Sequence, residues 1–203
     1  MCLFRMGGNI GSNYSFALEL RRMTTGAASS LGQIRLRAMF YPHDTDEYGN
    51  YRYRADGVDL SSQNIIGANT MEWAESWHYI VVKVLYDPNA SASASKPGRV
   101  GRSTVKFYCD FEETANTISY KDITNSSRSV VDGYLWTPGY VGSNAAIVLD
   151  LGNANIDGLP SFIGDIYEAR FWRQDNTDPT KFLLTGKWLF DDGPARSRVS
   201  SSG

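Results

Sequence analysis

The chain has 203 residues, of which 42% are hydrophobic and 21% are charged, and its formal net charge is -2. This length fits one domain, and this composition excludes a disordered or fibrous protein. So small a net charge attracts phosphate backbones weakly, and no stretch approaches about 18 consecutive apolar residues, so we expect neither a nucleic-acid partner nor membrane insertion.

The chain is rich in residues that favour strands and turns, with 12 Tyr, nine Phe, five Trp and 19 Gly. Aromatic side chains pack well on sheets, and glycine suits tight turns. Ten segments show strand patterns. In chain order they are 14–23, 33–40, 49–54, 77–86, 102–111, 117–120, 129–136, 145–151, 162–173 and 181–190. Short strands without a long amphipathic helix predict an all-β sandwich or barrel.

Three of these segments need a separate interpretation. Segment 77–86 is apolar on both faces, which predicts a central strand covered on both sides. Segment 89–101 is rich in Ser and Ala and is longer than a hairpin turn, so we expect a solvated loop. Along 162–173 the inward parity changes, which indicates either a β-bulge near Tyr167 and Glu168 or burial of both faces.

Three sequence motifs point to a known superfamily. The first motif is WHYIVV at residues 77–82, followed by Tyr86-Asp87, which is similar to a strand "W-H-x-V-x-V-x-Y-D". The second motif is KFYCD at residues 106–110, which is similar to a strand "Y-x-D-G". Residues 162–172, FIGDIYEARFW, are similar to a strand "F-x-G-x-I-x-E-V-R-I-W". The three motifs occur in the same order along the chain as in the laminin-G and concanavalin-A-like lectin-glucanase jelly-roll superfamily, which the chain therefore resembles.

The resemblance implies a fold and a division of the chain. It implies an all-β, two-sheet antiparallel jelly-roll sandwich over 13–192, with an N-terminal arm at 1–12 and a polar C-terminal tail at 193–203. The chain departs from the pattern at Phe111, which replaces the glycine expected after Asp110, and in its long 89–101 loop. Proteins of this architecture include lectins, adhesion modules, glycoside hydrolases and polysaccharide lyases, so the fold alone does not give the function.

The sequence argues against catalysis. A hydrolase of this fold needs two carboxylates flanking the scissile bond, and a laminarinase-type Glu-x-Asp-x-x-Glu strand is absent. Segments 19–21 and 33–35 are partly similar to alginate-lyase motifs, but Arg35 stands where that pattern has a histidine. A guanidinium does not shuttle protons at neutral pH. We therefore expect no enzyme, with a lyase or hydrolase as the less favoured alternative.

Histidines and cysteines offer little for chemistry. His43 and His78 are the two histidines, too few for a convincing triad or zinc motif. We expect His78 to be packed and hydrogen-bonded, and His43 to be solvated in a polar loop. Cys2 and Cys109 have no zinc-type spacing, and two cysteines rarely form a disulfide framework, so we expect both to be unpaired.

Calcium is the metal that the resemblance makes plausible, at loops on the sandwich rim. Asp44 and Asp46 alternate in one polar loop, and Asp191 begins an Asp-Asp pair near the C-terminus. Oxygen donors at alternate positions can converge on a calcium ion. The alternative is that each segment is an ordinary solvated turn.

Aromatic residues around two loops are the candidate ligand-binding residues, with Tyr48 and Tyr140, in the loops themselves, the better candidates. Tyr48 and Tyr51 lie in one group of tyrosines, and Trp136 and Tyr140 lie in another. Sugar C–H faces stack on exposed aromatic rings as other apolar ligands do. The alternative is that these side chains serve core packing and strand propensity.

These features suit two functions of different class. The leading hypothesis is a non-catalytic jelly-roll binding module that recognises a glycan or a protein surface through its rim loops. The alternative is a structural decoration or fibre subunit of a virion or cell-surface assembly, in homo- or hetero-oligomeric contact. Both imply an extracellular, cell-surface or virion-surface location, although residues 1–11 lack the apolar core of a signal peptide.

Overall fold

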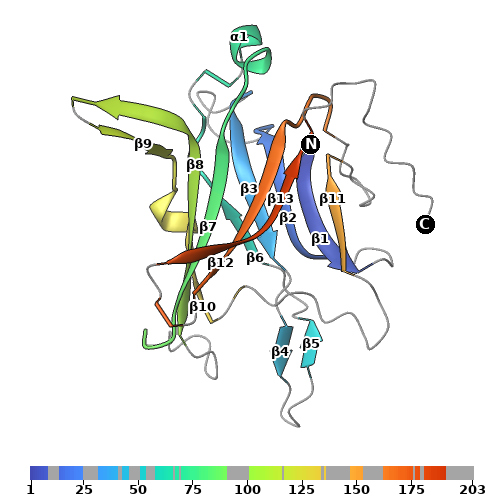
Figure 1. Cartoon of the computed structure of the whole chain (residues 1–203), viewed down its shortest axis with the longest axis vertical. Coiled ribbons are helices and arrows are strands. Elements are labelled where there is room, and N and C mark those ends of the chain that lie inside the picture. The colour runs from blue at the N-terminus through green and yellow to red at the C-terminus, as the bar shows by residue number, and fades with distance from the viewer. Residues whose placement is uncertain are drawn as a thin grey trace. The chain divides into compact units, whose positions relative to one another are not determined.

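The computed structural model describes residues 1–8, 14–24, 32–40, 43–45, 51–53, 58–65, 67–68, 70–90, 101–115, 117–133, 135, 147–152, 162–175, 177–178 and 181–190. The chain divides into two compact units, Met1–Phe162 and Ile163–Gly203. In this described part nearly all regular structure is antiparallel strand, which confirms the all-β class (Figure 1). None of the helices within it is both long enough and apolar enough to span a bilayer.

The larger sheet of unit 1 has five strands in the order β11-β1-β2-β3-β6. The strands are β1 (Cys2–Gly8), β2 (Tyr14–Arg22), β3 (Ile34–Phe40), β6 (Val58–Ser61) and β11 (Ile147–Leu151). Strand β1 lies within the N-terminal arm predicted at 1–12 and pairs with both β2 and β11. Strand β4 (His43–Thr45) pairs separately with β5 (Tyr51–Tyr53).

The second sheet of unit 1 has the order β10-β8-β7, with β9 also paired to β8. Its strands are β7 (Ile80–Asp87), β8 (Arg102–Thr114), β9 (Thr117–Asp122) and β10 (Val130–Asp132). A short helix, α1 (Met71–Ala74), precedes β7, and a 3-10 turn, η2 (Ser126–Arg128), precedes β10. The prediction that segment 77–86 is a central strand is wrong for the described pairings, in which β7 is an edge with β8 as its neighbour.

Alternating apolar residues build the core of the five-stranded sheet. In the β2–β3 register Phe16 lies opposite Phe40 and Leu20 opposite Leu36, so these side chains share one face. All four are buried. The ring centroids of Phe16 and Phe40 are 5.0 Å apart, a normal distance for an aromatic pair. The strand patterns predicted over 14–23 and 33–40 therefore have the expected buried face.

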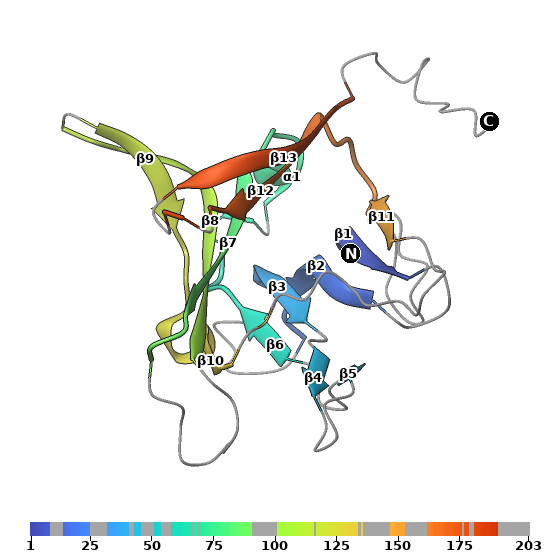
Figure 2. The ribbon, with the colours of Figure 1, turned by 60° about the horizontal axis from the view of Figure 1, so that its bottom comes forward.

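Backbone hydrogen bonds join the two sheets of unit 1 beside this core. The N–H of Gln63, just after β6, donates to the carbonyl of Ile123, just after β9, at 2.8 Å. The N–H of Ile123 in turn donates to the carbonyl of Phe107 in β8 at 2.9 Å. Val105, Phe107 and Ile123 are buried on this side. Unit 1 is thus sandwich-like, with separate antiparallel sheets and buried apolar side chains on each (Figure 2).

The opposite face of β2 and β3 carries a charged group. Arg37 Nη1 lies 2.8 Å from Oε1 of Glu19, whose side chain is 3% exposed, and Arg37 Nη2 lies 2.7 Å from Oδ2 of Asp59. Hydrogen bonds to Asp59 and to Glu19 raise the pKa of Arg37 above its usual value, although burial acts in the other direction. Arg37 therefore stays charged and compensates a buried carboxylate.

Unit 2 contains one described hairpin, β12 (Glu168–Gln174) and β13 (Phe182–Leu189). Residues 162–167 precede the strand, so the extended strand predicted from residue 162 is wrong in its first half. The register shifts between Phe171 and Trp172, where Thr185 is the extra residue on β13. The described hairpin thus has its extra residue on β13, not in 162–173 near Tyr167 and Glu168 as expected, and the alternative of two buried faces does not hold for β12, whose residues are half-buried or exposed.

Candidate functional site

The candidate site lies where β8 extends past β7. Strand β7 begins at Ile80, which is opposite Cys109, whereas β8 continues to Thr114. Residues 111–114 of β8 therefore pair with β9 only and form a two-stranded ribbon beyond the sheet (Figures 1 and 2). The ends of such ribbons expose both faces to solvent.

A β-bulge marks the start of this ribbon. The β8–β9 register passes from Tyr108 opposite Asp122 to Phe111 opposite Tyr120, which leaves one extra residue on β8. Asp110 has a φ of 63°, in the left-handed region that aspartate tolerates better than most residues. The resemblance expects glycine at the next position. Because Asp110 itself takes the left-handed conformation, Phe111 can stay in the strand.

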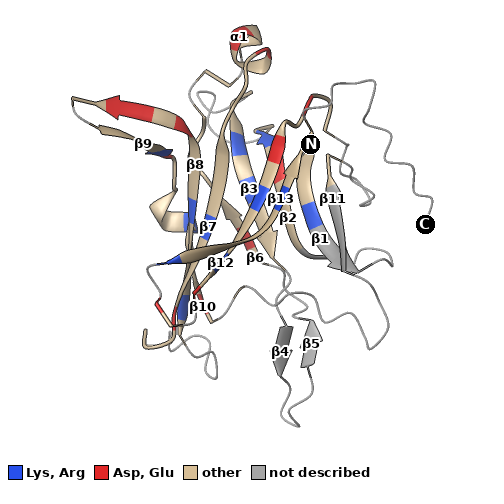
Figure 3. Ribbon diagram, in the orientation of Figure 1, with Lys and Arg blue, Asp and Glu red and all other residues tan. Residues whose placement is uncertain are grey.

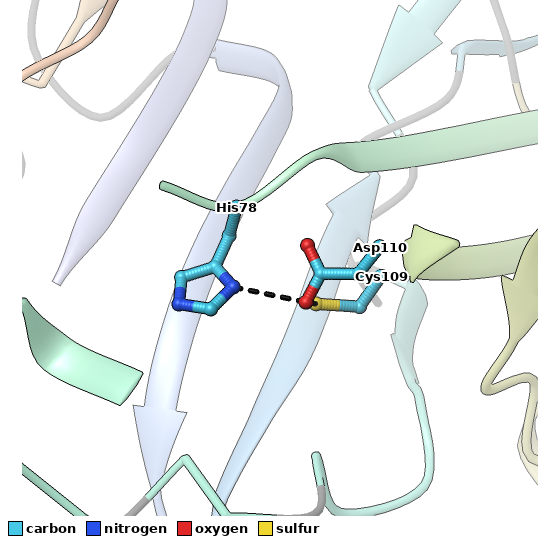
Figure 4. A group of neighbouring side chains, drawn as sticks. All are labelled: His78, Cys109 and Asp110. Atoms are coloured by element: carbon cyan, nitrogen blue, oxygen red, sulfur yellow. Dashed lines mark hydrogen bonds and ion pairs between the residues drawn. The ribbon is translucent and has the colours of Figure 1, made fainter. Parts of the chain in front are cut away.

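The bulge brings three side chains together. Nδ1 of His78 lies 2.9 Å from Oδ2 of Asp110, and Sγ of Cys109 lies 3.6 Å from the same oxygen (Figure 4). The ligand atoms of His78, Cys109 and Asp110 all lie within 4.8 Å of one another. Cys109 is buried and the other two are half-buried. We call these three residues the bulge cluster.

Backbone groups hold the outer atoms of the bulge cluster. Nε2 of His78 lies 2.6 Å from the carbonyl oxygen of Trp73, and the Trp73 ring stacks on the imidazole with centroids 4.0 Å apart. The N–H of Tyr79 donates to Oδ1 of Asp110 at 2.9 Å, and the N–H of Asp110 donates back to the Tyr79 carbonyl. The prediction that His78 is packed and hydrogen-bonded is confirmed.

The Cys109 thiol is unsuited to act as a nucleophile in this state. Burial, together with the neighbouring Asp110 carboxylate, raises the pKa of Cys109 to about 12. The thiolate is the reactive form of cysteine, and at neutral pH this thiol stays protonated. Its hydrogen bond goes to Asp110 rather than to His78. Cys2 and Cys109 are both free and buried, as expected.

On the other face, the bulge gathers aromatic rings. One extra residue reverses the side-chain parity of β8, so Phe111 emerges on the same face as Tyr108. The Tyr120 ring centroid lies 5.1 Å from Phe111, 6.1 Å from Tyr108 and 5.6 Å from Tyr79. We call Tyr79, Tyr108, Phe111 and Tyr120 the aromatic surface.

The aromatic surface is open to solvent at its outer end. Phe111 is 53% exposed and Tyr120 is 44% exposed. The next pair on this face of the ribbon is Glu113 opposite Ile118, because side chains alternate along each strand. Ile118 is also exposed. The surface therefore combines flat rings, an aliphatic side chain and a carboxylate.

Most of the site residues expected from sequence are not among the described residues. Tyr48, Trp136, Tyr140, Asp46 and Asp191 are outside the described residues. The backbones of Asp44 and Tyr51 are described, in β4 and β5, where Asp44 pairs with Arg52 and Tyr51 with Thr45, but their side chains are not. The rim-loop ligand site and the calcium site therefore stay predictions.

Sequence reasoning missed both the bulge cluster and the aromatic surface. Asp110 and Phe111 stand out by their place in a motif, yet the spacing of residues in one strand does not reveal its register against the next. The available signal is Asp110 itself, a carboxylate within an otherwise strand-like run. A charged residue with low strand propensity at such a position is typical of a bulge.

The chain was compared with protein-family models, curated proteins and solved structures, and none of them matches. A function is therefore inferred from the side chains and geometry of the bulge cluster and the aromatic surface.

Changing Asp110 tests the bulge directly. Asp110→Ala is expected to lower the free energy of unfolding by about 2 to 4 kcal/mol, because it removes the acceptor for the Tyr79 N–H and places alanine in the left-handed region. Asp110→Asn keeps an acceptor and adopts that conformation readily, so its loss is smaller. Urea unfolding compares the two, and equal losses would contradict this account of the bulge.

Proposed function

We propose that the protein is a non-catalytic jelly-roll binding module of the laminin-G and concanavalin-A-like kind, and that it binds a glycan through the aromatic surface. The observation that supports this most is the contiguous group of rings that ends in the exposed Phe111 and Tyr120. Exposed apolar patches of this kind commonly mark binding sites.

The geometry of the rings suits a sugar. The ring of Tyr120 is inclined by 12° to that of Tyr79 and by 28° to that of Phe111, so it stacks on both, whereas the Tyr108 ring is tilted by 56° to it. A pyranose presents flat C–H faces that pack on such rings. Glu113 on the same face can accept hydrogen bonds from sugar hydroxyl groups.

Charge and carboxylate placement support glycan binding over nucleic-acid binding or catalysis. Acidic residues lie at the tip of β8, and lysines and arginines are scattered over several strands (Figure 3). Glu112 and Glu113 are adjacent on β8 and therefore point to opposite faces of the ribbon. They do not form the facing pair of carboxylates that glycoside hydrolysis needs.

A glycan array on the purified full chain is the first experiment, followed by variants of Tyr120 measured against the best ligand. Tyr120→Leu is expected to weaken binding at least about tenfold, since loss of a central aromatic anchor commonly costs more than 1 kcal/mol. Tyr120→Phe keeps the ring and is expected to retain most of the affinity.

These paired variants distinguish stacking from general hydrophobic contact. Leucine preserves apolar area but offers no flat face, so a protein partner would tolerate Tyr120→Leu better than a sugar would. A blank array, or glycan binding that Tyr120→Leu leaves unchanged, would count against this function.

Calcium at the rim remains part of the proposal in its predicted place, at Asp44, Asp46 or Asp191. Calcium bound there stabilises the folded state by mass action, so calcium is expected to raise Tm. Glycan binding and Tm are therefore both measured with calcium and with a calcium-selective chelator. Identical melting in the two conditions would remove calcium from the proposal.

The second candidate function is a structural subunit of a virion or cell-surface assembly, and the hairpin of unit 2 favours it. Trp172 lies opposite Leu184 on one face, and Phe171 contacts Trp188 edge-on on the other. Trp172, Leu184 and Trp188 are all exposed. An isolated two-stranded hairpin is marginally stable, so these apolar side chains need a further surface to pack on.

Analytical ultracentrifugation of the full chain tests the structural role. Self-association that is reduced by Trp172→Glu would support a structural subunit. Either proposed function implies a location outside the cell, on the cell surface or on a virion surface. A protein that stays monomeric at high concentration and binds a glycan would leave the binding module as the better description.

A further inference from the structure

Hydrogen-bond geometry orients both ring nitrogens of His78 in the bulge cluster. The carbonyl oxygen of Trp73 can only accept a hydrogen bond, so Nε2 of His78, 2.6 Å away, carries a hydrogen and donates it. In a neutral imidazole the other nitrogen, Nδ1, then has a lone pair. That lone pair points at Oδ2 of Asp110, 2.9 Å away, which is also an acceptor when ionised.

Nδ1 of His78 and Oδ2 of Asp110 therefore face each other as two possible metal ligands. A third ligand atom is present, because Sγ of Cys109 lies 3.6 Å from the same carboxylate oxygen. One imidazole nitrogen, one sulfur and one carboxylate oxygen form a ligand set that zinc accepts.

Two of the three distances between ligand atoms suit a tetrahedral ion after a small movement, and the third, from Nδ1 to Sγ, is at most 4.8 Å. With zinc bonds of about 2.0 to 2.3 Å, ligand atoms in a tetrahedron lie about 3.4 to 3.6 Å apart. The Sγ–Oδ2 distance is already 3.6 Å. The Nδ1–Oδ2 distance of 2.9 Å must lengthen by about 0.5 Å, which a small rotation of the Asp110 side chain supplies.

The surrounding hydrogen bonds are those that usually orient metal ligands. A zinc-bound histidine commonly donates its other ring N–H to a backbone carbonyl, as His78 does to Trp73. Ligating carboxylates are themselves hydrogen-bonded, as Oδ1 of Asp110 is to the Tyr79 N–H. The side chain of Asp110 is 38% exposed, which leaves room for a water molecule as a fourth ligand.

We propose that Nδ1 of His78, Sγ of Cys109 and Oδ2 of Asp110 bind one zinc ion, with water completing the tetrahedron. The cysteine binds as a thiolate and releases its proton to solvent. The ion links the segment before β7 to the bulge of β8. It therefore holds the bulge from which the aromatic surface emerges, but the zinc site stands on the geometry of the cluster and does not depend on glycan binding.

Cobalt(II) is the probe for the test, because a cobalt–thiolate bond gives an intense near-ultraviolet charge-transfer band. The reduced, chelator-treated full chain is titrated with cobalt and then with zinc. We expect the band to saturate at one cobalt per chain and to disappear when zinc displaces cobalt. Cys109→Ser is expected to abolish the band. His78→Gln is expected to weaken zinc binding by more than about 100-fold, because loss of a direct ligand should cost more than loss of a residue that only hydrogen-bonds to a ligand.

The chain supplies matched controls, since it has one other cysteine and one other histidine. Cys2→Ser and His43→Gln are expected to keep the band and the zinc affinity of the unchanged protein. Circular dichroism checks that each variant is folded. If Cys109→Ser does not fold, Asp110→Asn replaces it, with zinc affinity as the readout.

Two outcomes would overturn the proposal. Folded, reduced protein that gives no thiolate band with excess cobalt would show that a proton, not a metal, lies between His78 and Asp110. A band that survives Cys109→Ser and is lost in Cys2→Ser would place the metal elsewhere. Neither outcome would affect the glycan-array result.

Discussion

Replacing Arg37 with methionine is expected to lower the free energy of unfolding by about 3 to 5 kcal/mol, the usual cost of removing one partner of a buried ion pair. The Glu19 side chain is 3% exposed and lies 2.8 Å from the guanidinium. Methionine matches much of the volume of arginine but removes the guanidinium that contacts this carboxylate. Urea unfolding at neutral pH measures the loss.

A second substitution separates charge from packing. In the double variant Glu19→Gln with Arg37→Met the buried carboxylate is gone, so stability is expected to recover by more than half of the loss. Asp59→Asn serves as the control, because Asp59 is half exposed and an exposed ion pair contributes about 1 kcal/mol or less. A double variant no more stable than Arg37→Met alone would show that the loss comes from packing.

The pattern of apolar and charged residues explains which strands could be predicted from sequence. Strands β2 and β3 have one apolar face, and the alternation of Phe16, Leu20, Leu36 and Phe40 is visible in the sequence. Strand β1 is not among the predicted segments, and it buries Arg5, although arginine is mostly exposed in proteins. A side chain buried by tertiary contacts cannot be recognised from a local pattern.

For the candidate site, the sequence predicted the strand that carries Cys109 and Asp110, but it also placed His78 in a strand, whereas β7 begins only at Ile80. It could not bring these residues together. His78 and Asp110 are 32 positions apart, and their contact depends on pairing between β7 and β8. The bulge depends on pairing between β8 and β9 as well. Register is a property of two strands, so one strand's residues do not determine it. Sequence does indicate which segments are solvated loops, and Tyr48 and Tyr140 lie in such segments.

The bulge connects the two halves of the site. Before it, alternate residues of β8 face inward, and Val105, Phe107 and Cys109 are all buried. The extra residue Asp110 turns its carboxylate toward His78 and reverses the side-chain parity in the rest of β8. One local irregularity therefore produces both a polar cluster and an exposed aromatic surface.

This reversal predicts that two phenylalanines in the same strand behave oppositely. Phe107 is 0% exposed and Phe111 is 53% exposed, four residues further along β8. Phe107→Ala is expected to lower the free energy of unfolding by about 3 to 5 kcal/mol, because it removes buried apolar area and leaves a cavity. Without the bulge, even spacing would place both rings on the same face.

Phe111→Ala is the matched control, with the same change of side chain outside the core. It is expected to lower stability by less than about 1 kcal/mol, since most of the ring is already in water, while it weakens ligand binding at the aromatic surface. Chemical unfolding and binding are measured on both variants. Losses of equal size in stability would mean that Phe111 packs in a core, and the exposed aromatic surface, with the binding function proposed for it, would have to be abandoned.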